Sequence, residues 1–163
     1  MMSNRGTDIL FQLIKSLEKA EKRHFKLYIK RSSGKADLKV VRLFDAIDKL
    51  AEYDDKALLK KLSGFTKPQL SNLKNHLYKE ILSSLRLLKS TDSIDLQLSE
   101  FYDNAHILYK KGLFLQSLRL IDRAKEMART HRKNNMLPQL LSLEKRIESL
   151  HITRNIQHRA HTL

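Results

Sequence analysis

The chain has 163 residues, with 32 Lys and Arg against 18 Asp and Glu, which gives a formal net charge of +14. It contains no Cys, which excludes disulfides, Cys-based zinc sites, iron–sulfur clusters and thiol nucleophiles. Leu occurs 30 times and Val only twice, and four Gly and two Pro leave few breaks, so the composition predicts an all-α fold with no sheet.

Apolar residues recur at three- and four-residue spacing along most of the chain, which predicts about seven helices packed as antiparallel helical hairpins. Thr7 is the predicted N-cap of the first helix, and Ser32-Ser33-Gly34 is its predicted end. The clearest start is Thr66-Lys67-Pro68-Gln69, because Thr, Pro and Gln stand where a capping box needs them. The predicted helices cover 7–31, 37–53, 54–62, 66–89, 94–111, 113–133 and 138–156.

No linker rich in Pro, Gly or Ser interrupts this pattern, so residues 1–163 are predicted to form a single helical domain. Within it we expect an N-terminal four-helix part over 7–90. A helical hairpin plus the last helix is expected over 92–157, and a frayed tail over 158–163.

The helix pair around Gly112 resembles a tetratricopeptide unit. Small residues allow the two helices to approach closely, larger ones fill the gaps, and Gly112 allows the reversal between them. The matching positions are Phe101, Ala105, Leu108, Gly112, Phe114, Ser117, Ile121 and Ala124. The chain departs from the pattern with Phe for Trp at 101, Leu for Tyr at 108, Ser for Ala at 117 and Arg for Pro at 129.

Four longer runs carry a further resemblance: Glu21–Tyr28, Leu43–Lys49, Lys74–Arg86 and Tyr109–Phe114. In these runs the chain resembles the N-terminal part of an uncharacterised bacterial family of longer, tetratricopeptide-like helical-repeat proteins. The resemblance implies a helical array of unknown function, of which this chain is a piece or a short member. It carries over no functional residues.

No apolar run approaches the roughly 18–20 residues that a membrane span requires. The first residues, Met1 to Gly6, do not form a basic segment followed by an apolar one, as a secretory signal would. We therefore expect a cytoplasmic chain without a membrane span.

Basic residues gather on two predicted helix faces. Lys19, Lys22, Lys26 and Lys30 share one face of the first helix, and Arg119 and Arg123 lie on a later helix. Such faces attract acidic partners or polyanions. The leading hypothesis is a non-catalytic helical-repeat interaction or scaffold module that binds an acidic protein or peptide. The simpler interpretation is that Glu18 and Glu21 pair with part of the first face and the remaining bases are only solvated.

The alternative hypothesis is a DNA- or RNA-binding protein. Residues 57–79 have the approximate spacing of a helix-turn-helix motif, with Gly64 at the turn. Lys67, Lys74 and Lys79 would then contact phosphates, together with the basic first helix. The competing interpretation is an ordinary helical hairpin with a polar face.

The sequence contains no motif that indicates catalysis or the binding of a metal or cofactor. The four Gly are far apart, so there is no Gly-rich phosphate loop, and the His-Glu-x-x-His and Gly-x-Ser-x-Gly motifs are absent. His158 and His161 could share a helix face, but they have no carboxylate at a suitable spacing for a metal site. We expect no enzyme activity, no catalytic or metal-ligating residues and no cofactor.

The last predicted helix carries an apolar stripe of Leu140, Leu143, Ile147 and Leu150. In a helical array this stripe would be covered by a following helix. In its absence a second copy of the chain could cover it, which predicts a homo-oligomer through the C-terminal helix.

Overall fold

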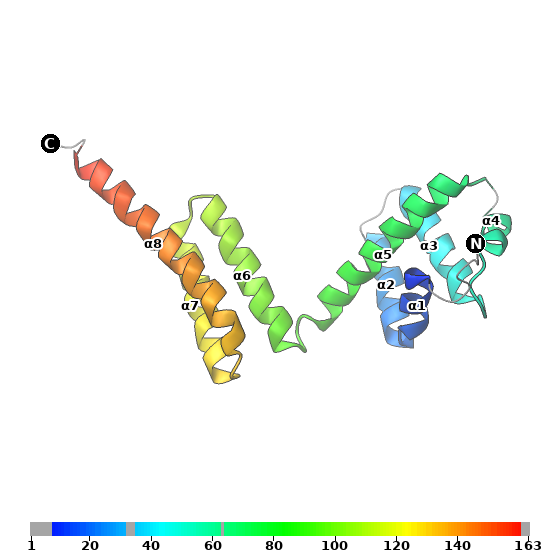
Figure 1. Cartoon of the computed structure of the whole chain (residues 1–163), viewed down its shortest axis with the longest axis horizontal. Coiled ribbons are helices and arrows are strands. Elements are labelled where there is room, and N and C mark those ends of the chain that lie inside the picture. The colour runs from blue at the N-terminus through cyan, green and yellow to red at the C-terminus, as the bar shows by residue number, and fades with distance from the viewer. Residues whose placement is uncertain (1–7, 32–34, 63, 161–163) are drawn as a thin grey trace, which may run out of the picture. The chain divides into compact units, whose positions relative to one another are not determined.

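The computed structural model describes residues 8–31, 35–62 and 64–160, which form helices and contain no strand (Figure 1). The all-α prediction is therefore confirmed. The helices are α1 (Ile9–Ser16), α2 (Lys19–Arg31), α3 (Lys35–Asp48), α4 (Asp55–Lys61), α5 (Lys67–Lys89), α6 (Ile94–Lys110), α7 (Phe114–Thr130), the short 3-10 helix η1 (Asn134–Met136) and α8 (Leu137–Ala160). The chain divides into two compact units at Leu88–Lys89.

The first predicted helix is two helices, so the expectation of one helix over 7–31 is wrong. Leu17 is extended, with φ −70° and ψ 135°, and ends α1. A carboxylate oxygen of Glu21 accepts a hydrogen bond at 2.9 Å from the N–H of Glu18, which caps the start of α2. The break allows α1 and α2 to pack separately against α3.

Local capping signals explain most of the other helix starts. Asp8 caps α1 by accepting from the N–H of Phe11 at 3.0 Å, whereas the predicted cap Thr7 lies outside the described residues, as does the predicted end at 32–34. The capping box at α5 is confirmed, because Gln69 Oε1 accepts from the Thr66 N–H at 3.0 Å and Thr66 Oγ1 accepts from the Gln69 N–H at 3.4 Å. Helix α3 ends at Asp48, five residues before the predicted end at Tyr53.

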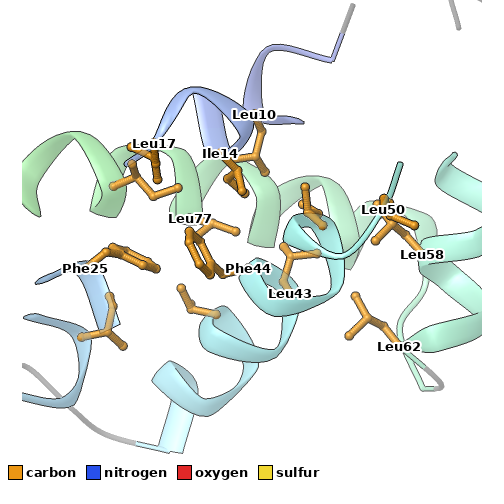
Figure 2. Close-up of a cluster of buried hydrophobic side chains, with 14 of the residues drawn as sticks. Leu10, Ile14, Leu17, Phe25, Leu43, Phe44, Leu50, Leu58, Leu62 and Leu77 are labelled. Atoms are coloured by element: carbon orange, nitrogen blue, oxygen red, sulfur yellow. The ribbon is translucent and has the colours of Figure 1, made fainter. Parts of the chain in front are cut away.

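The core of the first unit joins side chains from all five of its helices (Figure 2). Phe25 of α2 and Phe44 of α3 are directed toward one another, with ring centroids 4.8 Å apart. Leu77 of α5 lies beside them, and Leu10 and Ile14 of α1 belong to the same cluster. These side chains are almost fully buried, so α2, α3 and α5 are held around one apolar centre.

In the second unit α6 and α7 form a tight helical hairpin. Gly112, at φ +76°, follows the C-cap of α6, and the N–H of Leu113 donates to the Leu108 carbonyl at 3.0 Å. With the Gly112 N–H donating to Tyr109, this is a Schellman motif. Across the hairpin the buried Ser117 hydroxyl donates to the Ala105 carbonyl at 2.6 Å. The hairpin predicted around Gly112 is therefore present, whereas its assignment as a tetratricopeptide repeat stays a prediction.

The connection after α7 repeats the same turn with a less suitable residue. Arg132 has φ +56°, and the N–H of Lys133 donates to the Ala128 carbonyl at 2.7 Å. Helix α8 has Pro138 in its first turn, as predicted, but continues to Ala160, past the predicted end at Ile156. The last three residues of the predicted frayed tail lie outside the described residues.

We expect Gly112→Ala and Arg132→Gly to change the free energy of unfolding in opposite directions. A side chain at positive φ costs about 1 kcal/mol relative to Gly, so Gly112→Ala should destabilise by about that amount. Arg132→Gly should stabilise by about 0.5 kcal/mol, because relief of the strained backbone exceeds the entropy gained by the unfolded chain. Urea titrations followed by circular dichroism measure both. Arg132→Ala is the control, because it removes the same charge but keeps Cβ; an equal gain in Arg132→Ala would contradict the explanation.

Candidate functional site

The first surface of interest lies on α2, where five cationic side chains surround one apolar side chain. They line an open hollow of about 400 Å³: Lys19, Lys22, Arg23, Lys26, Lys30 and Leu27. We call these six residues the α2 basic face. The four lysines that the sequence placed on one helix face are thus brought together.

Two of these lysines are ion-paired with α3. Lys22 Nζ lies 2.7 Å from an oxygen of Asp48, and Lys26 Nζ lies 2.6 Å from an oxygen of Asp45. Lys26 Nζ also lies 5.7 Å from the centroid of the Phe44 ring. Since the two carboxylates belong to the neighbouring helix, these pairs connect α2 to α3 and offset part of the positive charge of the face.

The rest of the α2 basic face is open. Lys19 and Arg23 are exposed and form no ion pair within the described part of the chain. Between these cations the Leu27 side chain is 48% exposed. An apolar side chain ringed by cations can therefore be reached from solvent.

Lys74, which the nucleic-acid hypothesis placed at a phosphate, is held inside the first unit. Its side chain is only 19% exposed, and its ammonium forms an ion pair with Asp8 and a hydrogen bond with the Tyr53 hydroxyl. It also lies 4.6 Å from the centroid of the Tyr53 ring and 3.8 Å from an oxygen of Asp55. Lys74 therefore ties the start of α1 to the α3–α4 connection and to α5.

This cluster shifts the protonation of its members. Burial raises the pKa of the Asp8 carboxyl, but hydrogen bonds from Lys74 and from the Phe11 N–H outweigh burial, so that its pKa lies below the usual value. Burial, together with the neighbouring carboxylates of Asp55 and Asp8, raises the pKa of the Tyr53 hydroxyl. Tyr53 therefore stays protonated and donates to Asp55.

The other candidates on α5 are exposed. Helices α4 and α5 are joined through Gly64, at φ +101°, and Leu58 and Leu70 are buried on either side of the turn. Lys67 lines a hollow of about 800 Å³ that also contains Glu52, Asp54 and Asp55, so acids offset its charge. Lys79 is exposed farther along α5.

A second basic surface lies between α3 and α5. Its α5 side, with Gln69 and Asn72, belongs to the segment 57–79 of the nucleic-acid hypothesis, whereas its α3 side was not predicted as part of a site. This groove has a volume of about 560 Å³, and none of the residues that line it is an acid. We call it the α3–α5 groove. Its polar lining consists of Lys39 and Arg42 from α3 and Gln69, Asn72 and His76 from α5.

In the second unit, Arg119 and Arg123 are both exposed and lie one turn apart on α7. The apolar stripe of α8 is different from the prediction. Leu140, Leu143 and Ile147 are buried in the unit's own core, and only Leu150, 44% exposed, is open to solvent. The expectation that these three residues form an exposed stripe is therefore wrong, because the core of the unit covers them, whereas the homo-oligomer stays a prediction.

Among the described residues, no group of three or more His, Asp or Glu side chains is arranged to hold a metal ion. His24 Nδ1 lies 2.9 Å from the Ser84 hydroxyl, so this histidine has a structural partner. No helix in this part of the chain is both long enough and apolar enough to cross a membrane.

Comparison of the chain with protein-family models, curated proteins and solved structures finds no match.

We expect Asp8→Asn to remove part of the acid sensitivity of the first unit. A carboxyl whose pKa is lowered by folding stabilises the fold above its unfolded pKa of about 3.9, and this stabilisation is lost as the pH falls through the folded value. At pH 7 the variant should lose about 1–3 kcal/mol, because it breaks a half-buried charged hydrogen bond. At a pH near 2 it should approach the wild type.

Urea midpoints measured at several pH values test this expectation. Glu100→Gln, at an exposed position whose carboxylate forms no ion pair in the described structure, is the matched control and should leave the pH dependence unchanged. A constant difference between Asp8→Asn and wild type across the whole pH range would contradict the role given to Asp8.

Proposed function

We propose that the chain is a non-catalytic interaction module whose α2 basic face binds an acidic segment of a partner protein. The observation that carries the proposal is the half-exposed Leu27 among Lys19, Arg23 and the other cations of that face. An apolar side chain of a partner would pack on Leu27 and on the aliphatic stems of the lysines. Carboxylates on either side of it would meet the ammonium and guanidinium groups.

The ion pairs with α3 favour binding in a second way. Because Asp48 and Asp45 hold the ammonium groups of Lys22 and Lys26, these two long side chains lose little further freedom when a partner arrives. Lys19 and Arg23 remain for direct contact with carboxylates. The face thus combines two lysines whose positions are restricted, Lys22 and Lys26, with two exposed cations, Lys19 and Arg23. This combination suits a surface that recognises one kind of partner.

We propose a non-catalytic role because the polar side-chain groups of the α2 basic face are all cations. A protonated ammonium or guanidinium group neither accepts a proton nor attacks a substrate. Binding of nucleic acid by the segment 57–79 and the first helix is the alternative. It is less favoured at Lys74, because the ammonium of this lysine is already paired with Asp8 and Tyr53. It is less favoured at the first helix, because a phosphate backbone offers no apolar group that would pack on Leu27.

The test is quantitative capture of partners at moderate salt. We expect wild type to recover acidic proteins that two variants lose: Leu27→Ser, which removes the apolar contact, and Lys19→Gln combined with Arg23→Gln, which removes two open charges. Each loss should be about 10-fold or more, as for central interface residues. Crosslinking of a recovered protein to α2 would then locate the contact.

Two controls show whether a loss of binding is specific to the α2 basic face or follows from the loss of any surface charge or any exposed Leu. Lys110→Gln combined with Lys111→Gln removes the same charge from exposed positions of the second unit. Leu38→Ser removes a Leu of α3 that is 70% exposed. If the control variants lose the same partners as the α2 variants, or if wild type captures nothing specific while folded, the proposal is wrong.

A further inference from the structure

The charged residues of α3 are sorted by sign across the helix. Lys39, Arg42, Asp45 and Asp48 follow one another at three-residue spacing, and each step falls about 60° short of a full turn. After three steps the row has therefore moved halfway round the helix. The two acids reach α2, where they pair with Lys26 and Lys22, and the two bases reach the α3–α5 groove.

This sorting leaves the groove with cations and without any acid in its lining. Arg42 is exposed and forms no ion pair within the described residues. The ammonium of Lys39 lies 5.5 Å from the centroid of the Phe65 ring, which holds it at the edge of the groove. On the opposite wall His76 approaches a carboxylate oxygen of Glu80 at 3.8 Å.

The remaining polar groups of the groove supply hydrogen-bond donors. Gln69 uses its side-chain oxygen to accept from the Thr66 N–H in the capping box, which leaves its NH₂ group as the free end. Asn72 adds a second exposed amide one turn apart on α5. Phosphate oxygens only accept hydrogen bonds, so a wall of ammonium, guanidinium and NH₂ donors is complementary to them.

We propose that the α3–α5 groove binds the phosphate backbone of a nucleic acid. Three features favour this class of ligand over an acidic peptide. The apolar side chains that line the groove, Phe65 and Leu73, are half-buried and pack against the core of the unit, so none of them is exposed as Leu27 is on the α2 basic face. Its charges and amides match the polar, basic interfaces that nucleic acids select. The exposed side of α5 also continues the polar surface through Asn75 and Lys79.

This site is separate from the α2 basic face, because the two surfaces meet opposite flanks of α3. It also differs from the site predicted from sequence, because Lys39 and Arg42 of α3 replace Lys74 as the central cations. The amides of α5 then lie beside the phosphate contacts, where they can reach base edges or sugar oxygens.

Fluorescence anisotropy with a labelled duplex DNA and a labelled single-stranded RNA, each of about 20 nucleotides per strand, tests the proposal at about 50 and 200 mM salt. We expect wild type to bind at least one of them with a steep salt dependence; the two probes show whether the backbone is that of a duplex or of a single strand. Lys39→Gln combined with Arg42→Gln should weaken binding about 10-fold at the lower salt and reduce the log–log slope by about 2.

The controls separate the groove from the surplus charge of the whole chain. Lys110→Gln with Lys111→Gln, and Lys19→Gln with Arg23→Gln, each remove two charges outside the groove and should leave most of the affinity in place. Circular dichroism confirms that each variant is folded. The proposal is overturned if wild type binds neither probe at low salt, if the groove variant binds like wild type, or if either control loses as much affinity as the groove variant. Displacement of the probe by polyglutamate at equal charge would overturn it as well, because the groove would then select charge and not a phosphate backbone.

Discussion

The shortage of carboxylates is the constraint on which the surface of this protein depends. With 32 basic residues and 18 acidic ones, every acid that pairs with a base of another helix leaves fewer acids to offset the bases that remain on the surface. Among the described residues, several acids are placed in this way, and each pairs with a lysine of another element. The pairs include Lys22–Asp48, Lys26–Asp45, Lys74–Asp8, Lys125–Glu144 and Lys133–Asp95. Exposed ion pairs contribute little stability alone, so their larger effect is to decide which bases remain available to a ligand.

The two basic surfaces of the first unit differ in what accompanies their charge. On α2 an exposed Leu27 lies among cations, which suits a partner that offers an apolar side chain between carboxylates. Between α3 and α5 the polar companions of Lys39 and Arg42 are amides and an imidazole, and the apolar ones, Phe65 and Leu73, are half-buried, which suits a partner that offers hydrogen-bond acceptors. The winding of one charged row around α3 produces both surfaces, since it sends the acids to one flank of the helix and the bases to the other.

Most features set by a few neighbouring residues could be predicted from the sequence, and features set by distant residues could not. The capping box of Thr66 and Gln69 and the reversal at Gly112 are both local, and both are present. The break at Leu17 was missed because the apolar period continues across it, although Glu18 and Glu21 have the spacing of half a capping box. The partner of Lys74 is 66 residues away along the chain, so no local pattern could show that this lysine is enclosed. Likewise the sequence around Lys39 is that of the polar side of an ordinary amphipathic helix. Only the packing of α5 nearby shows that Lys39 lines a groove.

The position of both surfaces on the first unit has an electrostatic consequence. Residues 1–88 contain 19 bases and ten acids, so an anion bound on either surface lowers the positive potential that an anion meets on the other. Linkage makes this weakening reciprocal. At physiological salt the screening length is about 8 Å, so charges on opposite flanks of α3 affect one another only weakly. Under the two proposals, an acidic protein and a nucleic acid would therefore compete less at physiological salt than at low salt. The sorting of charge around α3 thus sets both where the two surfaces lie and how salt changes their coupling.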